Sequence, residues 1–352
     1  MKPCRPAIAL GLVLLLQGCF GDDGPGSPAE EEFPPPQEFG IDVPGFPGMP
    51  VPEDNPLTRQ GVALGRRLFY DPILSRDSTQ SCSTCHTQEF AFSDSGRRFS
   101  VGVDGTEGAR NAPSVINVAW NKALFWDGRA QTLEEQAVQP VINPIEMDET
   151  WDRVVAKLRR SPTYLDLFGE AFGTRQITRE RVVKAIAQFE RTLVSNNSKY
   201  DRSLRNEVTL SDAEQRGRIF FLSEIGDCFH CHDEFQFTVR DFRDIGLDLV
   251  PPDAGRSNVT GLPEDVGKFK IPTLRNIELT APYMHDGRFQ TLEEVLDHYD
   301  SGGVHSQNVD PLIRVGRGLG LTEQQKQDII AFLKTLTDST FVNNPDFSNP
   351  FE

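Results

Sequence analysis

Apolar residues recur along this chain at intervals of three and four positions, separated by charged and polar residues. This spacing places the apolar side chains on one face of a helix and therefore predicts amphipathic helices. The segments that show it most clearly are Gly61–Asp71, Trp151–Leu158, Thr178–Leu193 and Asp212–Phe221. Strict alternation of apolar and polar residues, which would predict β-strands, is scarce. We therefore expect a mainly α architecture.

Another helix is predicted from Leu292, Val295, Leu296 and Tyr299, which fall at positions i, i+3, i+4 and i+7. These positions share one helix face, so the phenol of Tyr299 is expected to point inward. His298 lies about 100° further around the helix, on the polar side.

The N-terminus has the pattern of an export signal. Lys2 and Arg5 precede an apolar run from Ala7 to Leu16, and Cys19 follows. The pattern is similar to bacterial lipoprotein signals, so we expect residues 1–18 to be removed and Cys19 to carry a lipid. This predicts a periplasmic protein held at the outer membrane by a lipid anchor. No other apolar run approaches the roughly 20 residues that a membrane-spanning helix needs.

Residues 19–56 are rich in Gly, Pro, Asp and Glu, which predicts a flexible acidic linker. The formal net charge of the whole chain is −16, and this balance argues against a nucleic-acid partner. A basic redox protein is a compatible partner, although a solvated acidic surface explains the charge equally well. The 352 residues leave room for two domains of ordinary size.

Four cysteines remain outside the signal and the lipid site, and they form two matching patterns. Cys82-Ser-Thr-Cys85-His86 and Cys228-Phe-His-Cys231-His232 both have the form Cys-x-x-Cys-His. This form is typical of haem c attachment, because two thiols one helical turn apart reach the two vinyl groups of one porphyrin while the adjacent His binds the iron. A zinc site or two redox dithiols are alternatives, but neither requires a His after each second cysteine. We predict two covalently bound haem c groups.

The chain also repeats itself around these motifs, at an offset of 159 residues. Trp126-Asp-Gly-Arg matches His285-Asp-Gly-Arg, and Pro113-Ser-Val-Ile-Asn117 matches Pro272-Thr-Leu-Arg-Asn276. Such a period indicates a duplicated unit. We therefore expect two c-type cytochrome-like haem domains in tandem, at residues 57–205 and 206–340, followed by a tail at residues 341–352.

The two copies differ at the position of Tyr299, where the first copy has Pro140. Tyr can bind haem iron and Pro has no donor atom, so we predict that Tyr299 is the sixth ligand of the His232 haem and that the His86 haem is open. On this open side we expect Gln136 and Glu146, whose carboxylate would move a proton from one peroxide oxygen to the other.

Each of these assignments has an alternative. Tyr299 can be an ordinary buried tyrosine, and Gln136 and Glu146 can be surface or capping residues. Thioether and imidazole groups also bind haem iron. The rival ligands of the second haem are Met284, His298 and His305.

From Leu57 to Leu336 the chain resembles the bacterial dihaem cytochrome c peroxidase and MauG family. The resemblance rests on the two haem motifs and on Phe125-Trp-Asp-Gly-Arg-Ala130, Asn143-Pro-Ile-Glu-Met147 and Leu279-Thr-Ala-Pro-Tyr-Met-His-Asp-Gly287. It implies a peroxide-reducing haem in the N-terminal domain, an electron-transfer haem in the C-terminal domain and a calcium ion between them.

On matching positions, the resemblance implies that Glu146 is the catalytic acid–base group, that Gln136 is its companion, and that Trp126 relays electrons between the haems. It also implies a set of calcium ligands, which are Asn111, Thr280 and Pro282.

Two departures from the family pattern bear on function. Classical members close the resting peroxidatic haem with a distal His, but no His occurs here between His86 and His230, so this haem is expected to be open without reductive activation. Classical members also carry Met where this chain and MauG-like members have Tyr299, and a phenolate favours oxidised iron. MauG relays through a Trp just before its second motif; this chain has Gly226 there, which argues against the same substrate.

The sequence therefore predicts a dihaem peroxidase that reduces hydrogen peroxide with electrons from a small cytochrome c or copper protein. One alternative is the same chemistry applied to the side chains of a partner protein. Another is a dihaem electron carrier without peroxidase activity.

Overall fold

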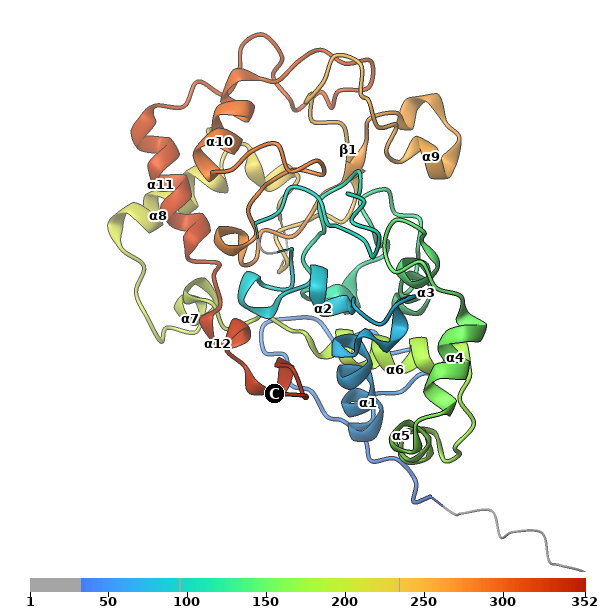
Figure 1. The fold of residues 1–352 in the computed structure, drawn as a ribbon. Helices are drawn as coiled ribbons and strands as arrows, with labels where there is room; N and C mark the ends of the chain where they lie inside the picture. Colours follow the sequence, from blue (N-terminus) through green and yellow to red (C-terminus); the bar gives the residue numbers. More distant parts are fainter. Residues whose placement is uncertain (1–32, 95, 234) are drawn as a thin grey trace, which may run out of the picture. The chain divides into compact units, whose positions relative to one another are not determined.

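Helices form most of the regular structure (Figure 1). The five helices expected from the apolar pattern are present, whereas those at Pro162–Phe172 and Glu323–Lys334 were not predicted. The computed structural model describes residues 33–94, 96–233 and 235–352. The predicted signal, Cys19 and the first part of the predicted linker lie outside these residues. Within the described ranges, no helix combines the length and the apolar character needed to cross a bilayer.

The helices of the first half are α1 (Arg59–Tyr70), α2 (Cys82–Cys85), α3 (Leu133–Ile142), α4 (Trp151–Arg159), α5 (Pro162–Phe172), α6 (Arg179–Thr192) and α7 (Lys199–Leu204). The second half contains α8 (Asp212–Phe221), α9 (Ser257–Thr260), α10 (Leu292–Ser301), α11 (Glu323–Lys334) and α12 (Ser339–Val342). Two short strands, β1 (Phe242–Arg243) and β2 (Phe269–Lys270), pair antiparallel. Short 3-10 helices include η3 (Val118–Trp120) and η4 (Cys228–His230). The predicted mainly α architecture is confirmed.

Each half contains one pair of helices in close contact, α1 with α6 and α8 with α11 (Figure 1). A glycine permits each approach. A Cβ atom on Gly65 of α1 would lie 1.8 Å from the carbonyl oxygen of Ala185, and one on Gly217 of α8 would lie 1.8 Å from that of Asp328. Backbone therefore meets backbone at both places, and a side chain at either glycine would force the helices apart.

The backbone repeats the duplication that the sequence predicts. Leu124 pairs with Ala130 in an isolated antiparallel bridge, and Tyr283 pairs with Phe289 in a second bridge at the same offset of 159. After these turns, α3 and α10 begin at equivalent positions. The hydroxyl of a preceding threonine caps each helix by accepting a backbone N–H, as is common at helix N-termini. The tandem duplication is confirmed.

Two apolar cores follow the two copies. The first joins α1, α3, α4, α5 and α6 and contains Phe168 and Ile186. The second joins α8, α10 and α11 and contains Phe221 and Phe332. Burial of such side chains stabilises each half by roughly 1.5–3 kcal/mol per large apolar side chain.

The predicted tail packs on the first half of the chain. Phe341 of α12 and Phe347 belong to a third apolar cluster together with Phe92. The hydroxyl of Tyr70 donates to the carbonyl oxygen of Phe347 at 2.7 Å. Residues 341–352 therefore support the loop that follows the first haem motif.

Residues 33–56, which the composition assigns to a flexible linker, lie along the folded part of the chain. Glu38 forms an isolated β-bridge with Thr58. Asn55 is only 2% exposed and donates to Glu134 at 2.6 Å. The composition did not indicate these contacts, because they use backbone groups and polar side chains rather than apolar surface.

Candidate functional site

The first haem motif lies on α2, and its histidine is held by the loop that follows. The Nδ1 atom of His86 lies 2.8 Å from the carbonyl oxygen of Phe92. A carbonyl can only accept, so Nδ1 carries the proton and Nε2 keeps a free lone pair for a metal. Burial lowers the pKa of His86, which favours the neutral ring that metal binding requires.

The second motif repeats this arrangement on η4. The Nδ1 atom of His232 lies 2.9 Å from the carbonyl oxygen of Phe237, and burial lowers the pKa of His232 to about 4. In both copies the accepting residue is the second Phe of a Phe-x-Phe segment, Phe90–Phe92 and Phe235–Phe237. None of the four described cysteines is in a disulfide. Both motifs therefore fit haem c, with two free thiols and one available imidazole nitrogen each.

A cavity opens beside the second motif, and Tyr299 lines it together with His232. Burial raises the pKa of the Tyr299 phenol, and the nearby thiols of Cys231 and Cys228 add to this increase. The phenol thus faces the motif across the cavity, as the helical stripe predicts. A metal ion there would lower this pKa and favour the phenolate.

The rival ligands lie in different places. The Nε2 atom of His298 is 2.9 Å from the carbonyl oxygen of Ile245, so this nitrogen already has a hydrogen-bond partner, and His298 does not line the cavity that Tyr299 lines. His305 is exposed. Met284 lines the same cavity as Tyr299, so it is the alternative iron ligand that is compatible with this geometry.

Glu146 lies beside the first motif. Burial raises the pKa of its carboxyl group, while the side chain of Asn143, which donates to Oε1 at 2.7 Å, opposes this increase. The Glu146 charge contributes to raising the pKa of Cys82 and Cys85, although burial is the larger cause for both thiols. The carboxyl group is therefore close to both haem-attachment positions.

The loop around Glu146 is fixed by its backbone. The N–H of Val103 donates to the carbonyl oxygen of Glu146 at 2.9 Å. A Cβ atom on Gly102 would lie 2.2 Å from the carbonyl oxygen of Ile145, so only glycine fits at that position. The loop that contains Gly102 and Val103 therefore supports the loop that carries Glu146, although more than 40 residues separate Gly102 from Glu146 in the sequence.

Gln136 and Pro140 are four residues apart on α3, so they share one side of the helix. Both are half-buried and flank the buried stripe of Leu133, Ala137 and Val141. The position that Tyr299 occupies in α10 is thus filled by Pro140 in α3. Their location on the open side of the first haem stays a prediction.

Two matching backbone hydrogen bonds join the halves. The N–H of Lys270 donates to the carbonyl oxygen of Trp126 at 2.8 Å, and the N–H of Asn111 donates to that of His285 at 2.7 Å. Asn111 is equivalent to Lys270 in the repeat, and Trp126 to His285, both at the offset of 159. The two bonds are therefore one contact made twice about a local two-fold axis, as in a symmetric dimer interface.

Trp126 lies at this junction. Its ring is 8% exposed, and its indole N–H donates to the carbonyl oxygen of Asn111 at 2.7 Å. The ring centroids of Trp126 and His285 are 6.5 Å apart, and His285 stacks on Phe269 with centroids 3.5 Å apart. Trp126 and His285 line the same cavity as His232. This position fits the predicted relay between the haems.

The residues predicted to bind calcium also line this cavity, namely Asn111, Thr280 and Pro282. The amide nitrogen of Asn111 donates to the carbonyl oxygens of Arg97 and Arg98 at 3.1 and 3.3 Å, so the amide oxygen points away from them. Oxygen atoms are the ligands that calcium prefers. The residue types therefore fit a calcium site.

Charged residues that were not predicted from the sequence also lie at the junction. Arg110 pairs with Asp127 at 2.6 Å and with Asp253 at 2.7 Å. The Lys270 side chain lines the cavity, and burial lowers its pKa to about 8. No local pattern could reveal the pair of Arg110 with Asp253, because 143 residues separate them.

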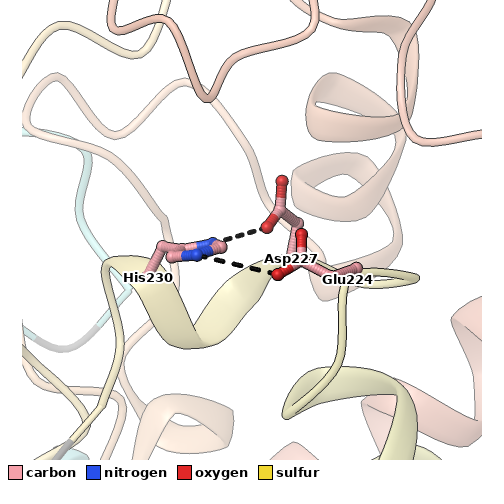
Figure 2. A group of neighbouring side chains, drawn as sticks. All are labelled: Glu224, Asp227 and His230. Carbon is pink, nitrogen blue, oxygen red and sulfur yellow. Dashed lines mark hydrogen bonds and ion pairs between the residues drawn. The ribbon is translucent and has the colours of Figure 1, made fainter.

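His230, inside the second motif, interacts with two carboxylates, those of Asp227 and Glu224 (Figure 2). Its Nδ1 atom lies 2.6 Å from Oδ1 of Asp227, and its Nε2 atom lies 3.9 Å from Oε1 of Glu224. These three side chains could hold a metal ion. However, Oδ2 of Asp227 already pairs with Arg314 at 2.9 Å, and a guanidinium opposes a second cation.

Comparison with known proteins agrees with the two motifs. A family model described as di-haem cytochrome c peroxidase matches residues 59–209. The methylamine utilization protein MauG of Methylorubrum extorquens is 40% identical over 294 residues, which cover 82% of this chain and 81% of that protein. The cytochrome c551 peroxidase of Nitrosomonas europaea is 36% identical over 316 residues, which cover 88% and 89% of the two chains.

Among solved structures, a MauG-like protein associated with microbial copper homeostasis is 39% identical, with a TM-score of 0.85. The match covers 89% of this chain and all of that one. The chain therefore belongs to the di-haem cytochrome c peroxidase and MauG family of oxidoreductases that act on peroxide.

Proposed function

We propose that this chain reduces hydrogen peroxide at the His86 centre and passes electrons to it through the His232 centre. The observation that carries the proposal is the difference between the two copies. Tyr299 lines the cavity beside His232, whereas Pro140, which offers no donor atom, occupies the equivalent position in α3. The His86 centre is therefore suited to react with peroxide, and the His232 centre is suited to store and transfer electrons.

Haem iron at His86 would supply the binding and polarisation of peroxide. The protein's part at this centre is proton movement by Glu146. Its carboxylate takes the proton from the inner peroxide oxygen and returns it to the outer oxygen, which leaves as water. Burial and the Asn143 hydrogen bond hold the carboxyl group beside the motif. Gln136 is the second polar group proposed for this side.

Trp126 is the proposed electron relay between the centres. Its ring is buried at the junction of the two halves, and its indole is oriented by the carbonyl oxygen of Asn111. The backbone hydrogen bonds from Lys270 to Trp126 and from Asn111 to His285 hold the two halves together at this junction.

A second candidate function is the oxidation of side chains on a partner protein. Tyr299 favours it, because a phenolate ligand stabilises oxidised iron and so suits the storage of oxidising equivalents. The MauG relatives favour it as well. The solved MauG-like protein is associated with copper homeostasis, which makes a copper-handling exported protein the partner class to test first.

Spectroscopy of the resting ferric protein tests the proposed ligands. We expect one high-spin and one low-spin haem by electron paramagnetic resonance, with the low-spin signal altered or lost in Tyr299→Phe. Tyr283→Phe is a matched control, because Tyr283 lines the same cavity but its hydroxyl donates to the carbonyl oxygen of Ile277 at 3.1 Å. Two low-spin haems that are insensitive to Tyr299→Phe would overturn the assignment.

Turnover separates the two candidate functions. Peroxide consumption that depends on reduced cytochrome c supports the peroxidase. Covalent oxidation of a co-purified protein, without turnover of cytochrome c, supports the second candidate.

We also propose a calcium ion at Asn111, Thr280 and Pro282, and a lipid anchor at Cys19 that holds the exported protein at the periplasmic face of the outer membrane. Asn111, Thr280 and Pro282 line one cavity and can offer side-chain or carbonyl oxygen atoms, which supports the first proposal, and the sequence of residues 1–19 supports the second. Chelation should change the low-spin signal reversibly, and labelled palmitate should enter the intact chain but not Cys19→Ser.

A further inference from the structure

Trp120 is a buried tryptophan that the mechanism described above does not use. It ends η3 and is 8% exposed. Its indole N–H donates to the carbonyl oxygen of Pro47 at 3.1 Å. Its ring centroid lies 5.3 Å from that of Phe46 and 5.7 Å from that of Phe235. Trp120 thus lies between the N-terminal segment and the loop that follows the second haem motif.

That loop leads directly to the second centre. Phe235 stands three residues after His232, and Phe237 accepts the Nδ1 hydrogen of His232 at 2.9 Å. Gln236, between them, donates to the carbonyl oxygen of Asn117 at 3.1 Å, which ties the loop to η3. The route from the His232 imidazole to the Trp120 ring is one hydrogen bond, a short stretch of backbone and one ring contact.

The neighbouring residue supports this placement. Asn121 lines the cavity that His232 also lines. On the side of the Trp120 ring that faces the N-terminal segment, Phe46 and Pro47 lie between the ring and solvent, since Pro47 is exposed and Phe46 is half-buried. Trp120 therefore connects the environment of the second centre with the surface.

The charge near the ring permits oxidation. The Arg275 guanidinium lies over the Phe46 ring at 4.7 Å, and a free cation there would oppose a positive charge on the indole. Arg275 is, however, paired with Asp201 through two hydrogen bonds of 2.8 and 2.9 Å. The pair neutralises the charge of the Arg275 guanidinium.

The three tryptophans of the chain have different surroundings. Trp126 lies at the junction of the halves. Trp151 belongs to the apolar core of the first half and donates to the carbonyl oxygen of Val138 at 3.3 Å. Trp120 is the one that contacts the loop after the second motif. Indole is also more easily oxidised than the phenylalanine rings around it.

We propose that Trp120 is the relay through which the second centre exchanges electrons with a molecule at the surface. The inference rests on the proposed reaction with peroxide, which supplies the oxidant. In the step, the Trp120 indole gives one electron to the haem centre that peroxide has oxidised. The indole keeps its N–H proton, which is bonded to Pro47, and becomes a radical cation. One electron from the external donor or partner protein then restores the indole.

The experiment uses the haem-loaded protein mixed with hydrogen peroxide in the absence of a donor. Freeze-quench paramagnetic resonance detects radicals, peptide mass spectrometry locates oxidised tryptophan, and peroxide loss is followed in the same samples. We expect an indole radical and oxidation at Trp120. Trp120→Phe should lose that radical, Trp120→Tyr should replace it with a tyrosyl radical, and Trp151→Phe should retain it.

Other outcomes overturn the relay. A radical that persists in Trp120→Phe, or oxidation confined to Trp126 or Trp151, excludes Trp120 as the exit while leaving the proposed function intact if peroxide is consumed. A protein that consumes no peroxide refutes the proposed function and the relay together.

Discussion

Glu146→Gln is the most direct test of the reactive centre. The substitution keeps the side-chain size and retains an oxygen for the Asn143 amide, which donates to Oε1 at 2.7 Å in the unaltered protein. It removes only the ability to take up and release a proton. General acid–base catalysis contributes roughly 10²- to 10⁴-fold, which corresponds to about 3 to 5 kcal/mol of barrier. We expect the rate of reaction with peroxide to fall by that factor.

Stopped-flow absorbance of the ferric protein mixed with peroxide measures this rate. Glu170→Gln, at an exposed position of α5, is the control for loss of a carboxylate elsewhere in the first half and should react at the normal rate. If Glu146→Gln also reacts at the normal rate, Glu146 is not the acid–base group.

Stability separates a chemical defect from a folding defect. Burial raises the pKa of Glu146 in the folded protein, so the stability associated with its neutral form is present at low pH and is lost as pH rises through the folded-state pKa. Gln never ionises and avoids this loss. The variant should therefore unfold at no lower temperature than the unaltered protein at pH 8, even though its reaction with peroxide is slow.

The pH dependence follows from the same contacts. The ionised carboxylate takes the first proton, so the rate should fall as pH drops through the pKa of Glu146. The Asn143 hydrogen bond lowers this pKa. Asn143→Ala should therefore move the acid limb of the rate profile to higher pH, and a shift to lower pH would contradict this account.

Three further predictions concern the junction and the scaffold. Trp126→Phe should slow electron transfer between the centres in stopped-flow experiments while leaving the resting spectrum unchanged. Asp201→Asn should cost about 3–5 kcal/mol in denaturant unfolding, because it leaves the guanidinium of Arg275 buried without a counter-charge. Gly217→Ala should lower the free energy of unfolding by about 1–3 kcal/mol, because the added Cβ would lie 1.8 Å from the carbonyl oxygen of Asp328.

The features predicted well from sequence depend on local periodicity or on the repeat. The stripe through Leu292, Leu296 and Tyr299 was sufficient to place the phenol on the inner side of α10, because helix geometry fixes direction from spacing alone. The offset of 159 aligned Trp126 with His285, and the structure has them in equivalent turns. Both inferences need only information carried by the chain near each residue or by its second copy.

The features that escaped prediction depend on contacts between distant segments. Arg110 pairs with Asp253, which is 143 residues away in the sequence, and the sequence around each residue contains no motif that predicts the pair. Residues 33–56 have the composition of a linker, yet Asn55 is buried by hydrogen bonds to Glu134 and Gln188. Composition averages the apolar surface that a segment can bury, and it registers neither polar contacts of this kind nor a single ring such as Phe46, which packs against Trp120.

The twofold junction between the halves has a consequence for chemistry. In a real homodimer both sides of such a contact must carry the same residue, so a change that improves one side is imposed on the other. Joining the two copies in one chain removes this constraint. The indole of Trp126 and the imidazole of His285 can then occupy equivalent turns. An electron that crosses the junction therefore passes different side chains in the two halves.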